Sequence, residues 1–245
     1  MSMEPYVFAH RGASGYEVEN TISSFETAVK MGAGIEADLR FTKNKRVICF
    51  HDPFFKVGDQ HYIIQNLTYH EIQAIKFEDH RKVPTLEDVF ETFNTVTHNL
   101  RYSFDIADKE VGLELLNIAR KLKVLDRIEI TDRRINVLSQ LRKQNQNVKL
   151  IYTIAENVNK ISDKSLILKK LNNINVYTIN LRIRQNVEEL FKQIIDNNLE
   201  CYIWGVNSKT NMKKILKLKY KNFFVNAIYT DYPDKLIDLI KEEFS

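Results

Sequence analysis

Residues 34–53 read GIEADLRFTKNKRVICFHDP, and this stretch guides the interpretation of the rest of the chain. Glu36 and Asp38 stand two apart among strand-forming residues, so both side chains leave one face of a strand, with Cα atoms about 7 Å apart. Two like charges on an otherwise apolar strand repel and resist burial unless a cation or a strong hydrogen-bond donor lies between them. A divalent metal ion is the usual cation at such a place.

The same stretch predicts a hairpin. Residues 42–45 supply a turn between two strand-forming runs, 34–41 and 47–50. Folding the chain about this turn brings His51 back opposite Asp38, so a short segment provides two acids and a histidine. Taken alone, the segment fits an exposed strand with solvated acids equally well, and the rest of the chain has to decide.

The composition is typical of a soluble globular protein, with 44% hydrophobic and 28% charged residues in 245. This length permits one large α/β barrel or two small domains. No apolar run approaches the roughly 20 residues that span a bilayer, and the N-terminal residues lack a signal-peptide pattern. We therefore expect a cytoplasmic protein without a transmembrane segment.

The charge pattern argues against nucleic-acid binding, and the two cysteines argue against a disulfide or a thiol nucleophile. The net charge is only +4, and the lysines crowded between residues 209 and 221 form the solvated face of a helix with an apolar stripe, so we expect no nucleic-acid partner. Cys49 and Cys201 lie in predicted strands, where a thiol is usually a small buried hydrophobe.

Strands and helices alternate along the chain. Strand-like runs start at residues 6 and 34 and continue at 102–106, 127–131, 149–154, 176–180, 200–205 and 224–230. Helical patterns begin at residue 21 and continue at 111–122, 135–144, 158–171, 187–197, 212–219 and 233–244. This alternation predicts an α/β fold, a (β/α)8 TIM barrel, if residues 47–50 are only the return arm of the hairpin.

The competing fold is an open doubly wound sheet. Its nucleotide-binding form carries a glycine-rich turn after the first strand, whereas this chain reads HRGASG at 10–15 and has only 7 glycines. The barrel is therefore favoured. We expect a single domain over residues 1–245, with a small insertion at about 54–82 after the second barrel strand.

In a barrel, the C-terminal ends of the strands meet at one mouth. More of the residues at these strand ends are polar or charged than a random distribution would place there. They are His10 and Arg11, Glu36 and Asp38, Asp105, Thr131, Trp204, and Thr230 with Asp231.

Seven motifs resemble those of the glycerophosphodiester phosphodiesterase family and occur in the family's order. They are HRG at 10–12, ENT at 19–21, GIEADLRFTK at 34–43, FHD at 50–52, PTLED at 84–88, WGVN at 204–207 and TDYP at 230–233. The resemblance covers the whole chain. It implies a TIM-barrel enzyme that hydrolyses small glycerophosphodiesters to glycerol 3-phosphate and an alcohol.

The resemblance also implies roles for particular residues. His10 and His51 match the acid/base pair, although which is the acid and which the base stays open. Arg11 matches a phosphate-binding arginine. Glu36 and Asp38 match metal ligands, with Asp105 as the third, and their hard carboxylate oxygens suit Ca²⁺ or Mg²⁺. Trp204 is expected to pack against the glycerol carbons.

The chain departs from the family pattern after residue 104. The family usually reads E-I-K there, and this chain reads Asp105-Ile106-Ala107. Aspartate keeps the carboxylate but shortens its reach. Ala107 removes a lysine expected to hold the phosphate, and Lys109 is the candidate to replace it.

Three functions follow for comparison. The first is metal-dependent glycerophosphodiester hydrolysis. The second is a lysophospholipase D reaction, which needs an apolar channel; the aromatic and aliphatic residues of the insertion could line one, or could form a small core of their own. They are Phe54, Phe55, Tyr62, Ile63 and Ile64. The third is a phosphodiester-binding protein that lost catalysis with the lysine at 107. The alcohol released and the oligomeric state stay open.

Overall fold

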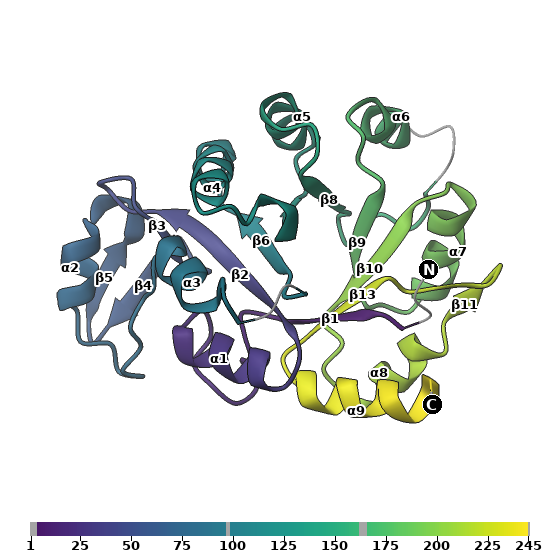
Figure 1. Ribbon diagram of the computed structural model, residues 1–245, viewed down its shortest axis with the longest axis horizontal. Coiled ribbons are helices and arrows are strands. Elements are labelled where there is room, and N and C mark those ends of the chain that lie inside the picture. Colours follow the sequence, from purple (N-terminus) through teal and green to yellow (C-terminus); the bar gives the residue numbers. More distant parts are fainter. Residues whose placement is uncertain (1–3, 97–98, 162–165, 245) are drawn as a thin grey trace.

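The computed structural model describes residues 4–96, 99–161 and 166–244, and its strands close into a barrel (Figure 1). Parallel neighbours run in the order β1, β2, β6, β7, β8, β9, β10 and β13, and β13 pairs back with β1. The predicted (β/α)8 TIM barrel is confirmed. The strands are β1 (Tyr6–Ala9), β2 (Gly34–Phe41), β6 (Tyr102–Ile106), β7 (Ile128–Asp132), β8 (Lys149–Thr153), β9 (Thr178–Arg182), β10 (Glu200–Trp204) and β13 (Ala227–Thr230).

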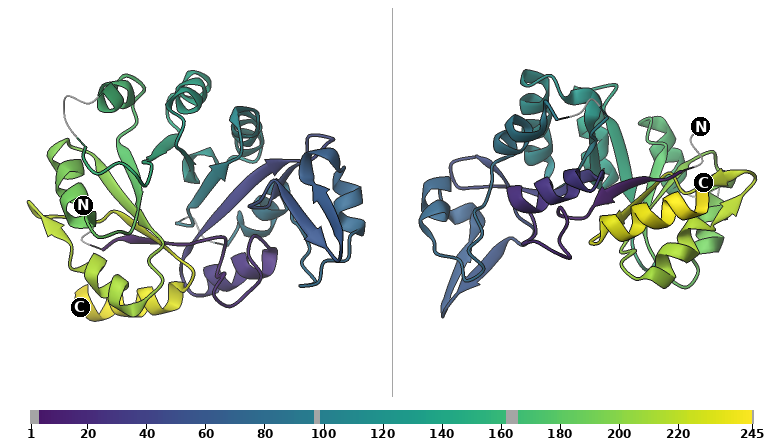
Figure 2. Two further views of the ribbon diagram at one scale, coloured as in Figure 1. Left: turned by 180° about the vertical axis from the view of Figure 1, so that it is seen from behind. Right: turned by 60° about the horizontal axis from the view of Figure 1, so that its bottom comes forward.

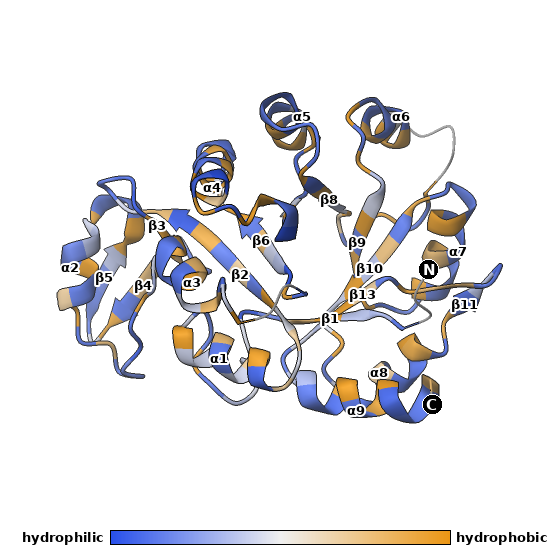
Figure 3. Ribbon diagram, viewed as in Figure 1, coloured by the Kyte–Doolittle hydropathy of each residue, from blue (hydrophilic) through white to orange (hydrophobic). Residues whose placement is uncertain are grey.

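Helices surround the ring on its outside (Figure 2). Each outer helix carries both hydrophobic and hydrophilic residues (Figure 3). In α7, for example, Val187, Leu190, Phe191 and Ile194 recur at helical spacing and are buried. Each such side chain contributes roughly 1.5–3 kcal/mol on burial. The helices are α1 (Ile22–Lys30), α3 (Leu86–Phe93), α4 (Lys109–Lys121), α5 (Ile135–Gln144), α6 (Leu166–Asn173), α7 (Val187–Asp196), α8 (Lys209–Leu216) and α9 (Pro233–Phe244).

The predicted hairpin forms at the end of β2. Strand β3 (Val47–Cys49) pairs antiparallel with β2, with Leu39 opposite Cys49 and Phe41 opposite Val47. The Phe50 amide donates to the Asp38 carbonyl at 2.8 Å. The return arm therefore lies outside the ring and delivers His51 to the end of β2.

The insertion folds beside β3, outside the ring (Figure 1). It contains the hairpin β4 (Phe54–Val57) and β5 (Gln60–Ile63), the short helix η1 (Ile64–Asn66) and α2 (Tyr69–Ala74). It has a hydrophobic core that includes Ile64 and Ile72, against which Phe55 packs. Phe54 and Ile63 remain exposed, at 57% and 46%. That residues 1–245 form a single domain stays a prediction.

Two predicted elements differ in the structure. The run 224–230 is interrupted, because β12 (Phe223–Phe224) pairs with β11 (Lys219–Tyr220) in a separate hairpin. Asn226 separates it from β13: its side-chain oxygen accepts from the Cys201 amide at 2.8 Å, and its own amide donates to the Cys201 carbonyl at 2.8 Å. Of the helix predicted at 158–171, residues 158–161 are not helical, residues 162–165 lie outside the described part, and the described helix is Leu166–Asn173.

None of the described helices is both long and apolar enough to cross a bilayer. The expected cytoplasmic location stays a prediction. Cys49 and Cys201 are buried free thiols, as expected for small core residues.

Candidate active site

Two connected hollows open at the C-terminal mouth of the barrel. The inner hollow has a volume of about 140 Å³ and the outer groove about 750 Å³. They share Asp38, His51, Asp105, Thr153 and Trp204. The predicted site residues that line the inner hollow are His10, Arg11, Glu36, Asp38, His51, Asp105 and Trp204.

Lys109 is the predicted site residue that the structure does not bring there. It starts α4, and its Nζ lies 3.0 Å from Glu110 Oε1. Another cation lies beside Ala107. Arg134 donates to the carbonyls of Ala107 and Ile106, each at 3.0 Å, and grips Asp132 through two nitrogens at 2.9 and 2.6 Å.

Three carboxylates come together because β2 and β6 are parallel neighbours. Asp38 is level with Asp105, and Glu36 is level with Ser103, one side-chain layer deeper. Glu36 is only 6% exposed, and its Oε2 accepts from the Arg11 amide at 2.7 Å. The inner hollow thus holds a deep acid below a pair of acids nearer solvent.

The ENT motif supports this cluster. Glu19 accepts from Arg11 Nη1 at 2.8 Å. Asn20 donates to Asp38 Oδ2 at 3.0 Å and accepts from the Asp38 amide at 3.1 Å. Thr21 caps α1 by accepting from the Ser24 amide. One tripeptide therefore orients an arginine, an aspartate and a helix.

Two of the three acids have raised pKa values, as expected for carboxylates that face one another with too little positive charge nearby. Burial, and then the charge of Asp38, raise the pKa of Glu36. Asp105 reaches the solvent-exposed surface of the mouth, but most of its surroundings are protein. This partial loss of water, together with the charges of Asp38 and Asp132, raises its pKa to about 7. A positive ion among these groups would offset both causes.

The described donors at the mouth are not arranged as a closed set of metal ligands. Within the described residues, no three His, Cys, Asp or Glu side chains meet around one point as ligands would. Arg11 Nε, at 3.2 Å from Asp38, and the Asn20 amide group hold that carboxylate instead. The chemistry of the donor set fits a hard divalent cation, because it has three carboxylates and, among the described residues, only Asp38 has a cationic side chain within ion-pair distance.

His10 follows β1 directly, and its Nδ1 lies 2.8 Å from Asp231 Oδ1. This bond leaves Nε2 for a substrate. Burial disfavours charge on the ring, but the hydrogen bond that the ring donates to Asp231 and the charge of Glu36 outweigh it and raise the pKa of His10. Asp231 is itself fixed, because its amide donates to Asn207 Oδ1 at 2.9 Å and its carboxylate accepts from Asn207 Nδ2.

The turn after His10 depends on glycine. Arg11 and Gly12 both have positive φ, at 57° and 79°. A Cβ at position 12 would collide with Ser24 of α1, so only glycine fits this close approach. The HRG motif thereby aims His10 and the Arg11 amide at one hollow.

His51 follows β3, the return strand of the hairpin with β2, and so reaches the mouth beside Asp38. Its Nδ1 lies 2.9 Å from Asp52 Oδ1, and its carbonyl accepts from Arg40 Nε at 2.7 Å. Its side chain is 42% exposed, compared with 29% for His10. His51 therefore stands at the boundary between the inner hollow and the outer groove.

Two polar atoms of the inner hollow were not expected from sequence. Asn180 Oδ1 and Trp204 Nε1 are buried and have no hydrogen-bond partner in the described part of the chain. Asn180 ends no recognisable motif, and only its place on β9 brings it to the mouth. Trp204 also carries Arg182 over its ring, at 5.2 Å from the centroid.

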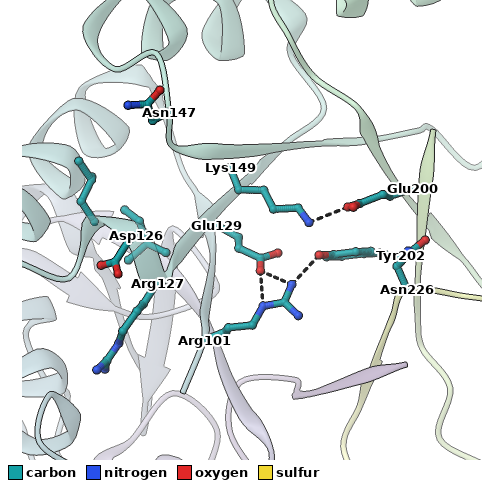
Figure 4. A pocket seen from close by; sticks show the side chains of 11 residues that line it. Arg101, Asp126, Arg127, Glu129, Asn147, Lys149, Glu200, Tyr202 and Asn226 are labelled. Atoms are coloured by element: carbon teal, nitrogen blue, oxygen red, sulfur yellow. Dashed lines mark hydrogen bonds and ion pairs between the residues drawn. The ribbon is translucent and has the colours of Figure 1, made fainter. Parts of the chain in front are cut away.

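A third hollow, of about 380 Å³, lies at the opposite end of the barrel (Figure 4). Arg101 donates to Glu129 Oε1 at 2.6 Å and to Tyr202 Oη at 2.6 Å, and Lys149 pairs with Glu200 at 2.6 Å. These charges satisfy one another. Polar networks at the N-terminal end of a barrel contribute to stability rather than chemistry.

The mouth gathers two histidines, three carboxylates and an arginine, which are groups that a hydrolase of phosphate esters needs. The profile described as the Glycerophosphoryl diester phosphodiesterase family matches residues 10–235, and the chain belongs to this family. The match confirms the family and the enzyme class, glycerophosphodiester phosphodiesterase, that the sequence motifs predicted.

Individual relatives agree with this assignment. The glycerophosphodiester phosphodiesterase of Caldanaerobacter subterraneus is 25% identical over 256 residues, covering 98% of this chain and 99% of the relative. Human lysophospholipase D GDPD1 is 22% identical over 280 residues, covering 95% and 85%. The Oleispira antarctica phosphodiesterase in complex with the product sn-glycerol-3-phosphate has a TM-score of 0.81 and 16% identity, with 97% of each chain covered. The last similarity establishes the fold.

Proposed function

We propose that this protein hydrolyses glycerophosphodiesters to glycerol 3-phosphate and an alcohol, using a divalent metal ion and two histidines. The observation that carries the proposal is that His10, His51, Arg11 and the three carboxylates line one inner hollow. The Caldanaerobacter enzyme's name, and the product held by the Oleispira enzyme, support the same substrate class.

The size of the hollows suggests how the substrate lies. The glycerol phosphate half fits the inner hollow, and the departing alcohol extends into the outer groove, which is about 750 Å³. Asn180 Oδ1 would accept from a glycerol hydroxyl, since it is buried without a partner in the described chain. Trp204 would cover the glycerol carbons.

Charge neutralisation comes first in the chemistry. Arg11 donates to the phosphate oxygens as a guanidinium. Glu36, Asp38 and Asp105 would hold Ca²⁺ or Mg²⁺, which when bound neutralises the phosphate and polarises its oxygens. Arg134 lies against the Ala107 carbonyl, near the position of the absent lysine, but its charge is balanced by Asp132.

The histidines then exchange protons with the reacting oxygens. His10 Nε2 takes the proton from the nucleophile, water or a neighbouring glycerol hydroxyl, while its Nδ1 stays bonded to Asp231. The nucleophile's oxygen bonds to phosphorus as the bond to the leaving oxygen breaks. His51 lies toward the outer groove and protonates that departing oxygen. With a glycerol hydroxyl as nucleophile, water opens the cyclic phosphate in a second step.

The test is glycerol 3-phosphate release from glycerophosphocholine and glycerophosphoethanolamine by metal-stripped protein, with and without added Ca²⁺ or Mg²⁺. We expect release to require the ion and to fall by about 10²–10⁴-fold in His10→Ala and in His51→Ala. His70→Ala, an exposed position on α2, is the matched control and should keep full activity. Release without any ion, or wild-type rates in either variant, would contradict the mechanism.

A lysophospholipase D reaction is the alternative, supported by the human relative's name. The apolar residues of the insertion give it little support. Phe55 and Ile64 pack in the insertion's own core, and Phe54 and Ile63 are exposed but line neither hollow. Turnover of lysophosphatidylcholine above that of glycerophosphocholine would favour this alternative. Ligand and metal binding with no turnover of either substrate would favour the binding-protein reading.

A further inference from the structure

The outer groove has an uneven charge balance outside the catalytic acids. Two of its arginine–acid pairs are neutral overall: Arg134 holds Asp132 through two nitrogens, and Arg182, which lies over Trp204 at the rim, holds Glu156 at 2.8 Å. Two arginines that line the groove have no such partner.

Arg40 is the first of them. It sits near the end of β2, and its Nε and one terminal nitrogen both donate to the His51 carbonyl. No carboxylate lies within ion-pair distance of it in the described residues, so its charge is anchored by a neutral group. Several of its N–H donors stay unclaimed.

Arg133 is the second. It follows β7, is exposed, and lines the same groove as Arg40. It makes neither a hydrogen bond nor an ion pair with any residue that the structure describes. Between the strands that carry these arginines runs β6, whose end presents the small side chain of Ala107 to the groove. In the strand register, Leu39 lies opposite Ile106 and Asp105 lies opposite Thr131. The positions that follow put Ala107 level with both arginines, and its side chain ends at Cβ.

The groove is poorly suited to a cationic alcohol. A quaternary ammonium group binds to free aromatic faces or unpaired acids. Trp204 is the one aromatic side chain among the described residues of the groove, and Arg182 already lies over its ring. Asp132 and Glu156 are both paired with arginines, and the other two acids of the groove, Asp38 and Asp105, are assigned to the metal ion under the proposed function.

We propose that the outer groove is a second anion subsite, in which Arg40 and Arg133 bind a phosphate carried by the leaving alcohol. Planar guanidinium groups match the oxygens of a phosphate, and the anchored Arg40 is already oriented. The inference rests on the proposed function, since it assigns the leaving alcohol to this groove. It names the preferred substrates as glycerophosphodiesters whose alcohol is itself phosphorylated.

The test compares three substrates: glycerophosphocholine, glycerophosphoglycerol, and glycerophosphoglycerol with a terminal phosphate. We expect kcat/KM to be highest for the phosphorylated compound, by about tenfold over the neutral one, because charge-assisted hydrogen bonds at a partly exposed site are of that strength. Arg133→Ala should remove most of this ratio, and Arg133→Glu should reverse it. Arg120→Ala removes an exposed arginine from α4 instead and should leave the ratio unchanged.

The same compounds are titrated calorimetrically into His10→Ala protein, which reports affinity without turnover. A phosphorylated-substrate preference that Arg133→Glu abolishes supports the subsite, even if the wild-type protein turns over none of the three, a result that would contradict only the proposed function. Equal affinities and equal kcat/KM values for the three compounds would overturn the subsite. So would a preference that Arg133→Glu leaves intact.

Discussion

His10 Nδ1 lies 2.8 Å from Asp231 Oδ1, although the two residues are 221 positions apart in the chain. Each directly follows a barrel strand, β1 and β13, and these strands are paired in register. A carboxylate at Nδ1 fixes the tautomer of the ring and stabilises its protonated form. The acidity of His10 is thus set by the neighbouring strand.

Asp231→Asn tests this relationship. Burial opposes the protonated ring and Asp231 favours it, so removing the negative charge lowers the pKa of His10. If His10 is the base, the acidic limb of the kcat/KM profile moves to lower pH, by about one unit. We also expect the maximal rate to fall, since a neutral amide stabilises an imidazolium less well.

The matched control is Asp234→Asn. Asp234 lies three positions after Asp231, and its carboxylate accepts a hydrogen bond from Tyr16. It should leave the profile in place. An acidic limb that does not move in Asp231→Asn would show that His10 does not govern it.

Glu36→Gln separates the stability of the metal-free protein from its activity. Burial and Asp38 raise the pKa of Glu36, so the folded state holds a proton that the unfolded state has lost. The free energy of unfolding of metal-free protein therefore falls as pH rises from about 5 toward 8, by on the order of 1–3 kcal/mol. The glutamine variant should show a smaller slope, since only the part due to Asp105 and its raised pKa remains, and it should lose its activity.

Thermal unfolding in a chelator, at several pH values, measures the effect. Added Ca²⁺ or Mg²⁺ should raise the Tm of the wild type more than that of Glu36→Gln. Equal pH slopes for the two proteins would contradict the interpretation of Glu36 as a buried acid that is protonated in the folded, metal-free protein.

Asn180→Ala removes the unpartnered oxygen from the inner hollow. If this oxygen accepts from a glycerol hydroxyl, kcat/KM should fall by about tenfold. The stability of the unliganded protein should change little, because Asn180 Oδ1 has no partner to lose among the described residues. An unchanged kcat/KM would remove Asn180 from substrate recognition.

Arg101→Met tests the network at the far end of the barrel. It leaves Glu129, which is 3% exposed, buried without its partner, and should cost about 3–5 kcal/mol. In Arg101→Met/Glu129→Leu the unpaired charge is gone, so most of the stability should return. Denaturant unfolding measures both; a double variant as unstable as the single one would show that packing, rather than charge, dominates.

The sequence predicted the fold and most of the candidate site where the chemistry is local. Two residues apart on a strand means one face, which placed Glu36 with Asp38. A turn between two strand-forming runs means a hairpin, which placed His51. These inferences need only the strand period and the turn, both of which are encoded in adjacent residues.

Interactions between distant segments were harder to predict. Arg134 lies against Ala107 because β7 is next to β6, whereas Lys109, nearer in sequence, turns to Glu110 at the start of α4. Similarly, Asn226 interrupts the strand-forming run 224–230, so that β13 starts only at Ala227, because its amide group bonds to β10. No periodicity within one segment contains this information.

The pairing around β1 also bears on how the protein is made. β1 contacts β13 over four residues but β2 over only two, Phe8 with Gly34 and Ala9 with Ile35. During synthesis, β1 therefore gains most of its strand pairing only once β13 is available. The His10–Asp231 hydrogen bond thus depends on the joining of the first and last barrel strands, a contact of high sequence separation that is slow to form.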